Sequence, residues 1–257
     1  MIVDSLTFLG ESLFGATATA ADLLARMDEL GIDRAIVCPF KPRGYHLGPA
    51  NDAVAEATAA HPDRLTGFAR VDPNVGEDAC AELEHALDEL GLAGVFLNPW
   101  EETFRVSAPL VDPVLETARR RRVPVIVAAG YPWLSEGLQV GELARRFPDV
   151  TIVATNGAQI NISGLGQDDA ELALAANANL SIQTAGVYRE DFIEGVAARI
   201  GADRVLYASA FPLLDPRLEI LRVRWAPNLG EPQRAIVLGG NAARLLLPPS
   251  AADPEGG

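Results

Sequence analysis

MIVDSLTFLG, residues 1–10, is the stretch that decides how this chain folds. Met1–Val3 predicts the start of a buried β-strand, and Leu6 and Phe8 continue one face of it, because strand side chains alternate between two faces. No secretory signal precedes this strand, so we expect it to begin at the chain terminus. The residues near its end therefore determine which kind of site the fold can carry.

The rest of the chain alternates short apolar runs with segments of helical periodicity. Seven further strands are predicted, at Ala35–Cys38, Leu65–Val71, Gly94–Leu97, Val123–Ala129, Val150–Ala154, Leu180–Thr184 and Arg204–Ser209. Helices are predicted at Leu23–Leu30, from a cap at Asn51 or Asp52 to Ala60, and at Ala79–Leu90, Val111–Arg121, Val140–Phe147, Glu171–Asn177, Phe192–Ile200 and Pro232–Leu246. Eight such units predict an α/β fold, a single (β/α)8 TIM-type barrel.

The predicted barrel covers residues 1–249, and residues 250–257 are expected to form a disordered tail because they are rich in Gly and Pro. The net charge of −14 and the pI near 4.6 argue against a nucleic-acid partner, which would need clustered Lys and Arg. No apolar stretch is long enough to predict a membrane span. Two cysteines give no disulfide framework, so we expect a cytoplasmic protein. The expected partner is a small-molecule ligand, with a homodimer left open.

Six segments carry a family resemblance by their order and spacing: LGIDRAIV (Leu30–Val37), HPDRLTGFARVDP (His61–Pro73), GLAGVFLNP (Gly91–Pro99), RRFPDVTIVATNG (Arg145–Gly157), GADRVLYASAFP (Gly201–Pro212) and, near the end, the stretch from ILRV (Ile220–Val223) to GGNAARLL (Gly239–Leu246). With these segments the chain resembles the amidohydrolase-related barrels, the branch that contains metal-dependent decarboxylases and small lactone or amide hydrolases. The resemblance covers nearly the whole length. It implies a (β/α)8 barrel with its active site at the C-terminal ends of the strands.

The resemblance also implies where a catalytic metal would bind. In the family, the usual ligands are a His-x-His pair on the first strand, histidines ending the fifth and often the sixth, and an aspartate ending the eighth. The matching positions here are Leu6, Phe8, Ala128, Thr155 and Ala210. Hydrocarbon side chains cannot coordinate a cation, and one threonine is a poor ligand. Because the chain has three histidines in all, another histidine cage is excluded, and we expect no metal and no cofactor.

Candidate site residues lie at the predicted strand ends and in the loops that follow them. The acid/base candidates are His46, Glu101, Tyr131 and Tyr188, since each side chain can carry a proton. The substrate-binding candidates are Arg70, Asn98, Trp100, Trp133, Thr155, Asn156, Phe8 and Phe211. For Arg70 two interpretations stay open: a clamp for a substrate carboxylate, or a partner of a carboxylate in the chain itself. Such a mouth suits an apolar or aromatic ligand held by a few hydrogen bonds.

Two functions remain open at this level. The first is a metal-independent enzyme that performs cyclisation, elimination, decarboxylation or hydrolysis by acid/base chemistry on a small, partly aromatic or polyketide-like carbonyl substrate. The second is a catalytically inactive pseudoenzyme, a barrel that binds a ligand or partner without turnover. An enclosed cavity with polar groups pointing into it would favour the enzyme. A mouth filled by Leu6, Phe8, Phe96 and Phe211 would favour the pseudoenzyme.

Overall fold

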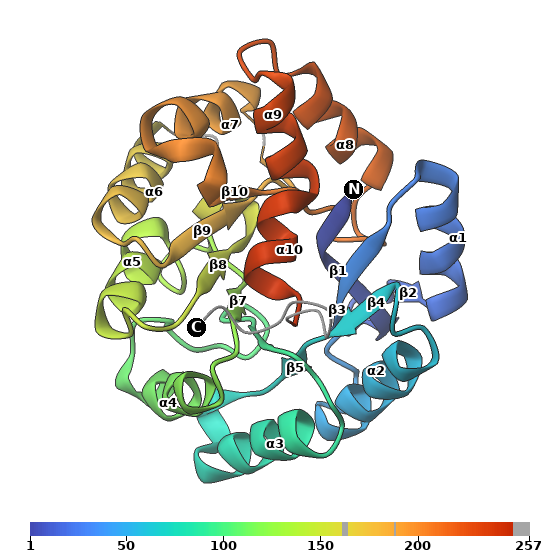
Figure 1. Cartoon of the computed structure of the whole chain (residues 1–257). Helices are drawn as coiled ribbons and strands as arrows, with labels where there is room; N and C mark the ends of the chain where they lie inside the picture. Colours follow the sequence, from blue (N-terminus) through green and yellow to red (C-terminus); the bar gives the residue numbers. More distant parts are fainter. Residues whose placement is uncertain (161–163, 188, 249–257) are drawn as a thin grey trace, which may run out of the picture.

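Parallel strands close into a barrel in the computed structural model, which describes residues 1–160, 164–187 and 189–248 (Figure 1). In chain order these strands are β1 (Val3–Glu11), β3 (Arg34–Pro39), β4 (Leu65–Gly67) continued by β5 (Ala69–Arg70), β6 (Val95–Leu97), β7 (Val125–Val127), β8 (Ile152–Ala154), β9 (Leu180–Gln183) and β10 (Val205–Leu206). With β4 and β5 counted as one, they occupy the eight positions of a (β/α)8 barrel. The fold class predicted from the sequence is confirmed.

The third strand position is split into two halves at Phe68. The Phe68 N–H donates to Val37 O at 2.8 Å, whereas the Ala69 N–H donates to Gly94 O at 2.8 Å. The first half thus pairs with β3 and the second with β6. The Phe68 ring fits inside the barrel because residue 94 has no side chain, since a Cβ there would lie 2.4 Å from the ring.

The ring closes where β1 meets β10 and the residues that follow it. The Ser5 N–H donates to Tyr207 O at 3.1 Å, and the Phe8 N–H donates to Phe211 O at 2.8 Å. Thr7 and Phe211 form a parallel bridge in the same place. The first strand is therefore hydrogen-bonded to the last along the length that carries Leu6 and Phe8.

Helices surround this barrel, as Figure 1 shows. They are α1 (Ala20–Leu30), α2 (Gly48–Ala60), α3 (Glu77–Asp88), α4 (Asp112–Arg121), α5 (Gly137–Arg146), α6 (Gly164–Ala176), α7 (Glu190–Val196), α8 (Pro216–Trp225), α9 (Glu231–Ala235) and α10 (Asn241–Leu246). A capping box at Thr19 and Asp22 begins α1, and Gly31, with φ 68°, ends it. No helix in the described part of the chain is long and apolar enough to cross a membrane.

The alternation of side chains along the strands produces two apolar layers. Leu9 on β1 packs in the outer layer, between the strands and the helices, whereas Leu6 and Phe8 point into the barrel. The barrel interior is filled by a separate cluster that includes Ile36, Cys38, Phe40, Phe68, Phe96, Ile126, Val153, Leu206 and Ala208. The interior is thus a packed core, and a site can form only at its ends.

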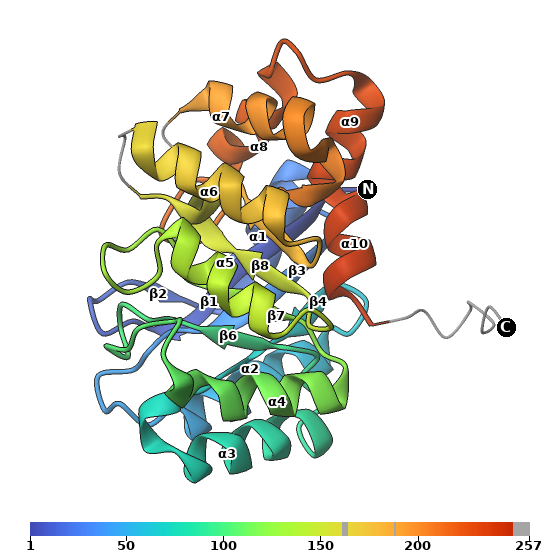
Figure 2. The same ribbon diagram turned by 90° about the vertical axis from the view of Figure 1, so that its left-hand side faces the viewer.

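Helix α10 covers one end of the barrel, in front of the strands in Figure 1. Its side chains Ala242 and Leu246 belong to the interior cluster, so they close that end. The opposite end, on the left in Figure 2, receives the C-terminal ends of the strands and the loops that follow them. That end is left for a functional site.

Several details differ from the sequence-based expectations. A short strand β2 (Thr17–Ala18) returns antiparallel to β1, and helix α8 was not predicted. Helix α2 begins at Gly48, so Asn51 lies inside it and is no cap; its buried amide bonds Arg70 instead. The predicted tail, 250–257, and the barrel boundary at residue 249 fall outside the described residues.

Candidate functional site

A pocket of about 90 Å³ lies at the C-terminal ends of the strands, and we call it the mouth pocket. Its apolar lining consists of Leu6, Phe8, Phe40, Phe96, Ala128, Ala210 and Leu213, and its polar lining of Arg70, Asn98, Glu101, Tyr131, Thr155 and Asn156. The five positions that the family resemblance matches to metal ligands all line this pocket. The barrel thus brings these residues from β1, β7, β8 and β10 or their ends to one place.

Three phenylalanines in the apolar lining of the mouth pocket contact one another. The rings of Phe8 and Phe40 are stacked with centroids 4.9 Å apart, and Phe96 meets Phe8 edge-on at 5.5 Å. All three side chains are buried. The inward face of β1 therefore ends in an aromatic cluster.

Arg70, at the end of β5, is buried beside two carboxylates of the chain. Its Nη2 lies 2.6 Å from Glu101 Oε2 and 2.8 Å from Glu102 Oε1, while Nη1 donates to Pro39 O at 3.3 Å. The guanidinium also lies 5.5 Å from the centroid of the Phe96 ring. Of the two interpretations of Arg70, the pairing with carboxylates of the chain itself is the one observed. Arg70 still lines the mouth pocket.

Lys41 adds a second cation to this cluster. Its Nζ donates to Glu101 O at 2.6 Å and lies 3.5 Å from Glu102 Oε1. Burial raises the pKa of the Glu102 carboxyl, and the charges of Arg70 and Lys41 oppose that rise. Two cations thus face two carboxylates, and Glu101 is the acid of this cluster that also lines the mouth pocket.

The backbone of Arg70 is fixed by α2. The Asn51 Oδ1 accepts the Arg70 N–H at 2.8 Å, and Asn51 Nδ2 donates to Arg70 O at 3.0 Å and to Glu82 Oε1 at 2.7 Å. Side-chain amides can satisfy a strand backbone in this way where the sheet hydrogen bonds end. Asn51 therefore positions Arg70 from the outer layer.

Tyr131 contributes a phenol to the polar lining. Its ring stacks on Trp100 with centroids 5.4 Å apart, and Trp100 is half exposed. Burial raises the pKa of Tyr131, and the charge of Glu101 raises it further. The phenol therefore keeps its proton at neutral pH and can donate it in a hydrogen bond.

Thr155 and Asn156 join the ends of β7 and β8. The Thr155 Oγ1 accepts the Ala129 N–H at 3.0 Å, and Asn156 Nδ2 donates to Ala129 O at 3.2 Å. Gly130 allows this approach, because a Cβ there would lie 2.5 Å from the backbone of Gln159. Both polar side chains line the mouth pocket while they hold these two loops together.

Ala210 adopts a left-handed backbone conformation, with φ 52°. This region costs an L-residue such as alanine roughly 1–2 kcal/mol, and asparagine and aspartate enter it more readily. The residue lies directly on the mouth pocket. The backbone at this position is therefore strained although its side chain is a single methyl group.

The structure brings together seven of the twelve predicted site residues in the mouth pocket: Phe8, Arg70, Asn98, Glu101, Tyr131, Thr155 and Asn156. Their proposed roles stay predictions. Tyr188 lies outside the described residues. The other four are displaced from the pocket, each for a different reason.

His46 lies in the loop after β3, and its exposed ring borders two cavities other than the mouth pocket. Its acid/base role stays a prediction. Trp133 is 77% exposed, and Trp100 reaches the site only through its stacking on Tyr131. Phe211 is partly buried against the outer layer.

The sequence analysis missed Phe40 and Glu102 at the site. Glu102 follows Glu101 directly, and a pair of acids after a strand with an arginine nearby was a signal that could have been used. Phe40 follows Pro39 at the end of β3, where an aromatic residue alone gives no sign of a pocket. Within residues 1–160, 164–187 and 189–248, no group of three or more His, Cys, Asp and Glu side chains is arranged to hold a metal ion.

The fold is therefore that of a TIM-barrel protein with a candidate site at the C-terminal ends of its strands. Residues 15–247 match the amidohydrolase family model, and the chain belongs to this family.

Individual relatives are decarboxylases. The chain is 24% identical over 281 residues to the gamma-resorcylate decarboxylase of Polaromonas sp. (strain JS666 / ATCC BAA-500), covering 86% of this chain and 85% of that protein. The solved 2,6-dihydroxybenzoate decarboxylase from Rhizobium superposes with a TM-score of 0.76 at 19% identity, covering 95% of this chain and 98% of that one. A dihydroxybenzoic acid decarboxylase from Polaromonas sp. JS666, solved with bound manganese and the inhibitor 2-nitroresorcinol, gives a TM-score of 0.74 at 18% identity, over 95% and 96% of the two chains.

Proposed function

We propose that this protein is a lyase of the amidohydrolase family that removes carbon dioxide from a small aromatic carboxylic acid by acid/base chemistry, without a bound metal. The observation that carries the proposal is the Glu101 carboxylate, 14% exposed and held by the buried Arg70 against an aromatic-lined pocket. The relatives named above act on resorcylate and dihydroxybenzoate, which are aromatic acids. The same substrate class suits the aromatic lining here.

The chemistry needs a proton at the ring carbon that loses its carboxylate. Glu101 would deliver that proton to the ring carbon. The electrons of the breaking C–C bond return to the ring as carbon dioxide leaves, and Glu101 is left as the carboxylate that pairs with Arg70 and takes up its next proton from solvent. Tyr131, which keeps its proton, would donate a hydrogen bond to a substrate oxygen. Asn98 is less available, because its Oδ1 accepts the Glu101 N–H at 3.3 Å.

A metal does not fit the residues present in the mouth pocket. The positions matched to ligands offer four hydrocarbon side chains and the Thr155 hydroxyl, and that hydroxyl already accepts the Ala129 N–H. Manganese, which a relative binds, prefers several oxygen or imidazole ligands. Glu101 and Glu102 are engaged by Arg70 and Lys41. We therefore assign no step of the reaction to a metal.

Glu101→Gln is expected to lower the rate of decarboxylation by about 10²-fold, because the amide cannot deliver a proton. The measurement is carbon dioxide release from 2,6-dihydroxybenzoate and from other hydroxylated benzoates. Glu84→Gln, which removes a surface carboxylate paired with Arg120, is the matched control and should leave the rate unchanged. Equal rates for Glu101→Gln and the unmodified protein would rule out this role of Glu101.

Metal removal is expected to change neither turnover nor stability. The protein is purified with EDTA, analysed for metals, and assayed with and without added Mn²⁺. About one metal ion per chain, or activity that returns only with Mn²⁺, would refute metal independence. Thermal unfolding in the same buffers gives a second readout, since a resident metal would raise the melting temperature.

A second candidate function, a pseudoenzyme that binds a ligand or partner without turnover, is favoured by the size of the mouth pocket. Its 90 Å³ are well below the roughly 300–1,000 Å³ of ordinary ligand sites, because Phe8, Phe40 and Phe96 fill the space. The absence of carbon dioxide release from every hydroxylated benzoate tested, in a folded protein, would favour this candidate over the lyase.

A further inference from the structure

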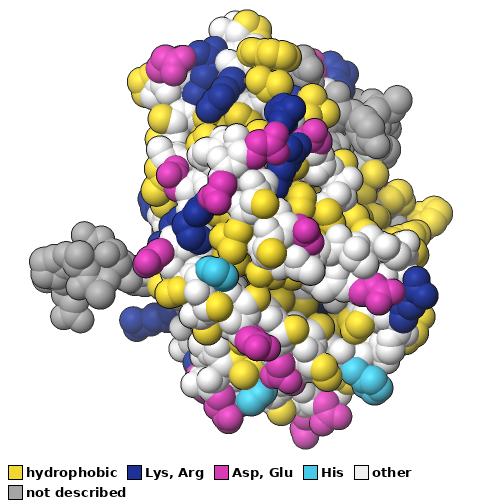
Figure 3. All heavy atoms as spheres, turned by 90° about the vertical axis from the view of Figure 1, so that its right-hand side faces the viewer, with side chains coloured by type: hydrophobic (Ala, Val, Ile, Leu, Met, Phe, Trp, Pro, Cys, Tyr) yellow, Lys and Arg dark blue, Asp and Glu magenta, His cyan; other side chains and the backbone are white. Residues whose placement is uncertain are grey.

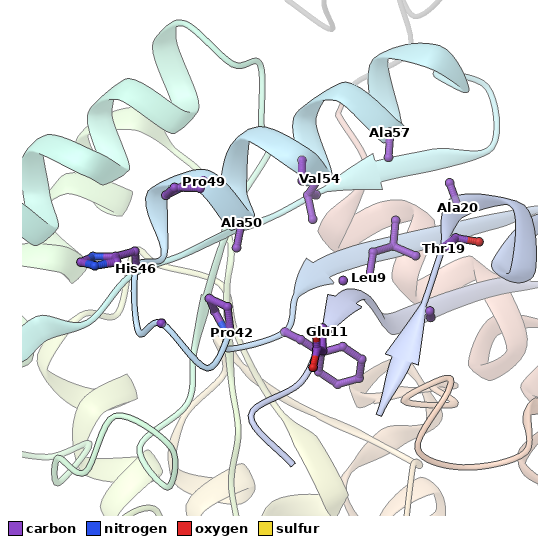
Figure 4. A pocket seen from close by; sticks show the side chains of 15 residues that line it. Leu9, Glu11, Thr19, Ala20, Pro42, His46, Pro49, Ala50, Val54 and Ala57 are labelled. Atoms are coloured by element: carbon purple, nitrogen blue, oxygen red, sulfur yellow. The ribbon is translucent and has the colours of Figure 1, made fainter. Parts of the chain in front are cut away.

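A larger cavity of about 500 Å³ lies beside the mouth pocket, and we call it the side cavity (Figure 4). It is bordered by the end of β1, strand β2, the loop after β3 and one face of α2, and it is partly open to solvent. Its lining is mostly apolar: Leu9, Ala18, Ala20, Phe40, Pro42, Pro49, Ala50, Ala53, Val54 and Ala57 are joined by Gly10, Glu11, Thr19, Gly44 and His46. Nothing in the proposed reaction uses this space.

Small side chains on α2 leave the side cavity open. Ala50, Ala53 and Ala57 lie on one face of the helix at the spacing of its turns, and Figure 4 shows Ala50 and Val54 directed toward Leu9. A helix that packs on a barrel normally fills this interface with larger residues. Here methyl groups line a space that no side chain of the described chain occupies.

The polar groups of the side cavity lie at its edges. Glu11 forms an exposed ion pair with Arg43 at 3.3 Å, and His46 borders both this cavity and a neighbouring one. In Figure 4 the His46 ring is directed away from the alanines of α2. A ligand would therefore contact hydrocarbon along most of its surface, and a polar end would meet solvent or the Glu11–Arg43 pair.

Phe40 forms a wall that the side cavity shares with the mouth pocket. It lines both spaces, and its ring stacks on Phe8 on the mouth side. The two spaces differ in size by about fivefold, so the larger one matches the volume of ordinary small-molecule sites whereas the mouth pocket does not.

We propose that the side cavity is a binding site for a small, uncharged, largely aromatic or aliphatic molecule. A concave shape that is partly open to solvent, with an apolar interior and polar edges, is that of a small-molecule site, whereas a protein partner would need a broad surface. The site is separate from the proposed decarboxylation, because neither Glu101 nor Tyr131 lines it. A bound molecule would press on Phe40 and thus on the aromatic side of the mouth pocket.

Fluorescence titration with N-phenyl-1-naphthylamine, a neutral apolar probe, tests the site. The unmodified protein is expected to bind the probe, and Ala53→Leu to weaken binding at least tenfold by filling the cavity. Ala53 is exposed to the cavity, so the larger side chain fits without repacking the core. Ala59→Leu makes the same change on the same helix outside the cavity and should bind as the unmodified protein does.

Three outcomes of the titration would overturn the proposal. The first is no saturable binding, and the second is an equal loss of affinity in Ala53→Leu and Ala59→Leu. The third is loss in Ala128→Val, which narrows the mouth pocket, with none in Ala53→Leu. Sedimentation velocity tests whether a second copy of the chain occupies the side cavity instead of a small molecule. Self-association that Ala53→Leu abolishes would assign the cavity to that second copy and overturn the proposal. The titration measures binding of the probe and does not depend on carbon dioxide release. A failure of the proposed decarboxylation would therefore leave the result for the side cavity unaffected.

Discussion

Replacing Arg70 with methionine is expected to lower the free energy of unfolding by about 3–5 kcal/mol, the usual cost of breaking a buried ion pair on one side. The side chains of Arg70 and Glu102 are 1% and 0% exposed, so water cannot take over the lost contacts. In the variant, Lys41, at 3.5 Å, would be the one remaining ion-pair partner that offsets the cost of burying the Glu102 carboxylate. Urea denaturation of both proteins at pH 7.5 measures the difference.

Two comparisons identify the cause of that loss. Arg120→Met breaks an exposed ion pair with Glu84. It should lower the free energy of unfolding by no more than about 1 kcal/mol, much less than Arg70→Met does. Adding Glu102→Gln to Arg70→Met should recover part of the stability, because the second change removes the uncompensated buried charge. Equal losses for Arg70→Met and Arg120→Met would contradict the buried cluster as described.

Asp4→Asn is expected to stabilise the protein at pH 8 and to have little effect near pH 4. Asp4 is 1% exposed, and its oxygens accept the Ser209 N–H at 2.9 Å, the Leu6 N–H at 3.3 Å and the Tyr207 hydroxyl at 3.4 Å. No ion pair to Asp4 occurs among the residues that the structure describes. Burial therefore dominates and raises the pKa of Asp4 from 3.8 to about 7, and the hydrogen bonds only partly oppose it.

The direction of the pH effect follows from proton binding. Between about pH 4 and pH 7 the folded protein holds the Asp4 proton and the unfolded chain has lost it, so stability falls as pH rises, by about 4 kcal/mol in total. The asparagine amide can still accept from Ser209 and Leu6 but does not titrate. The measurement is the stability difference between variant and unmodified protein from pH 4 to 8. With the exposed Asp63→Asn as control, a difference that stays constant with pH would contradict the raised pKa.

The barrel could be predicted from the sequence because short apolar runs and segments of helical periodicity alternate regularly along the chain. Each short apolar run is followed within three residues by Gly, Pro or Asn, and the alternation with helices repeats through the chain, so small errors at boundaries do not change the topology. The missed elements lack that periodicity. Strand β2 has two residues, and α8 follows a Pro-containing turn whose Asp215 cap becomes evident only in the structure. Phe68 splits its strand because of the contact with residue 94, which no local pattern encodes.

The candidate site was predictable where a residue's place on a strand fixes its direction. Phe8 on β1 and Thr155 directly after β8 line the mouth pocket, because strand register determines which face the side chains at a strand end take. His46 and Trp133 do not, since they lie in loops whose course depends on tertiary contacts. The burial of Asp4 and the Arg70 cluster also depend on residues distant in sequence, so their pKa values and pairing could not be inferred from spacing.

The left-handed backbone of Ala210 determines which side chains that position accepts at low cost. Aspartate tolerates this conformation better than alanine does, so one substitution would place an acid at the end of β10 without new backbone strain. Phe8 is different, because a histidine there would put unpaired ring nitrogens between Phe40 and Phe96, at a cost of about 1–3 kcal/mol for each unsatisfied group. An engineered metal site would therefore be accepted more readily at position 210 than at position 8, where the aromatic packing opposes it.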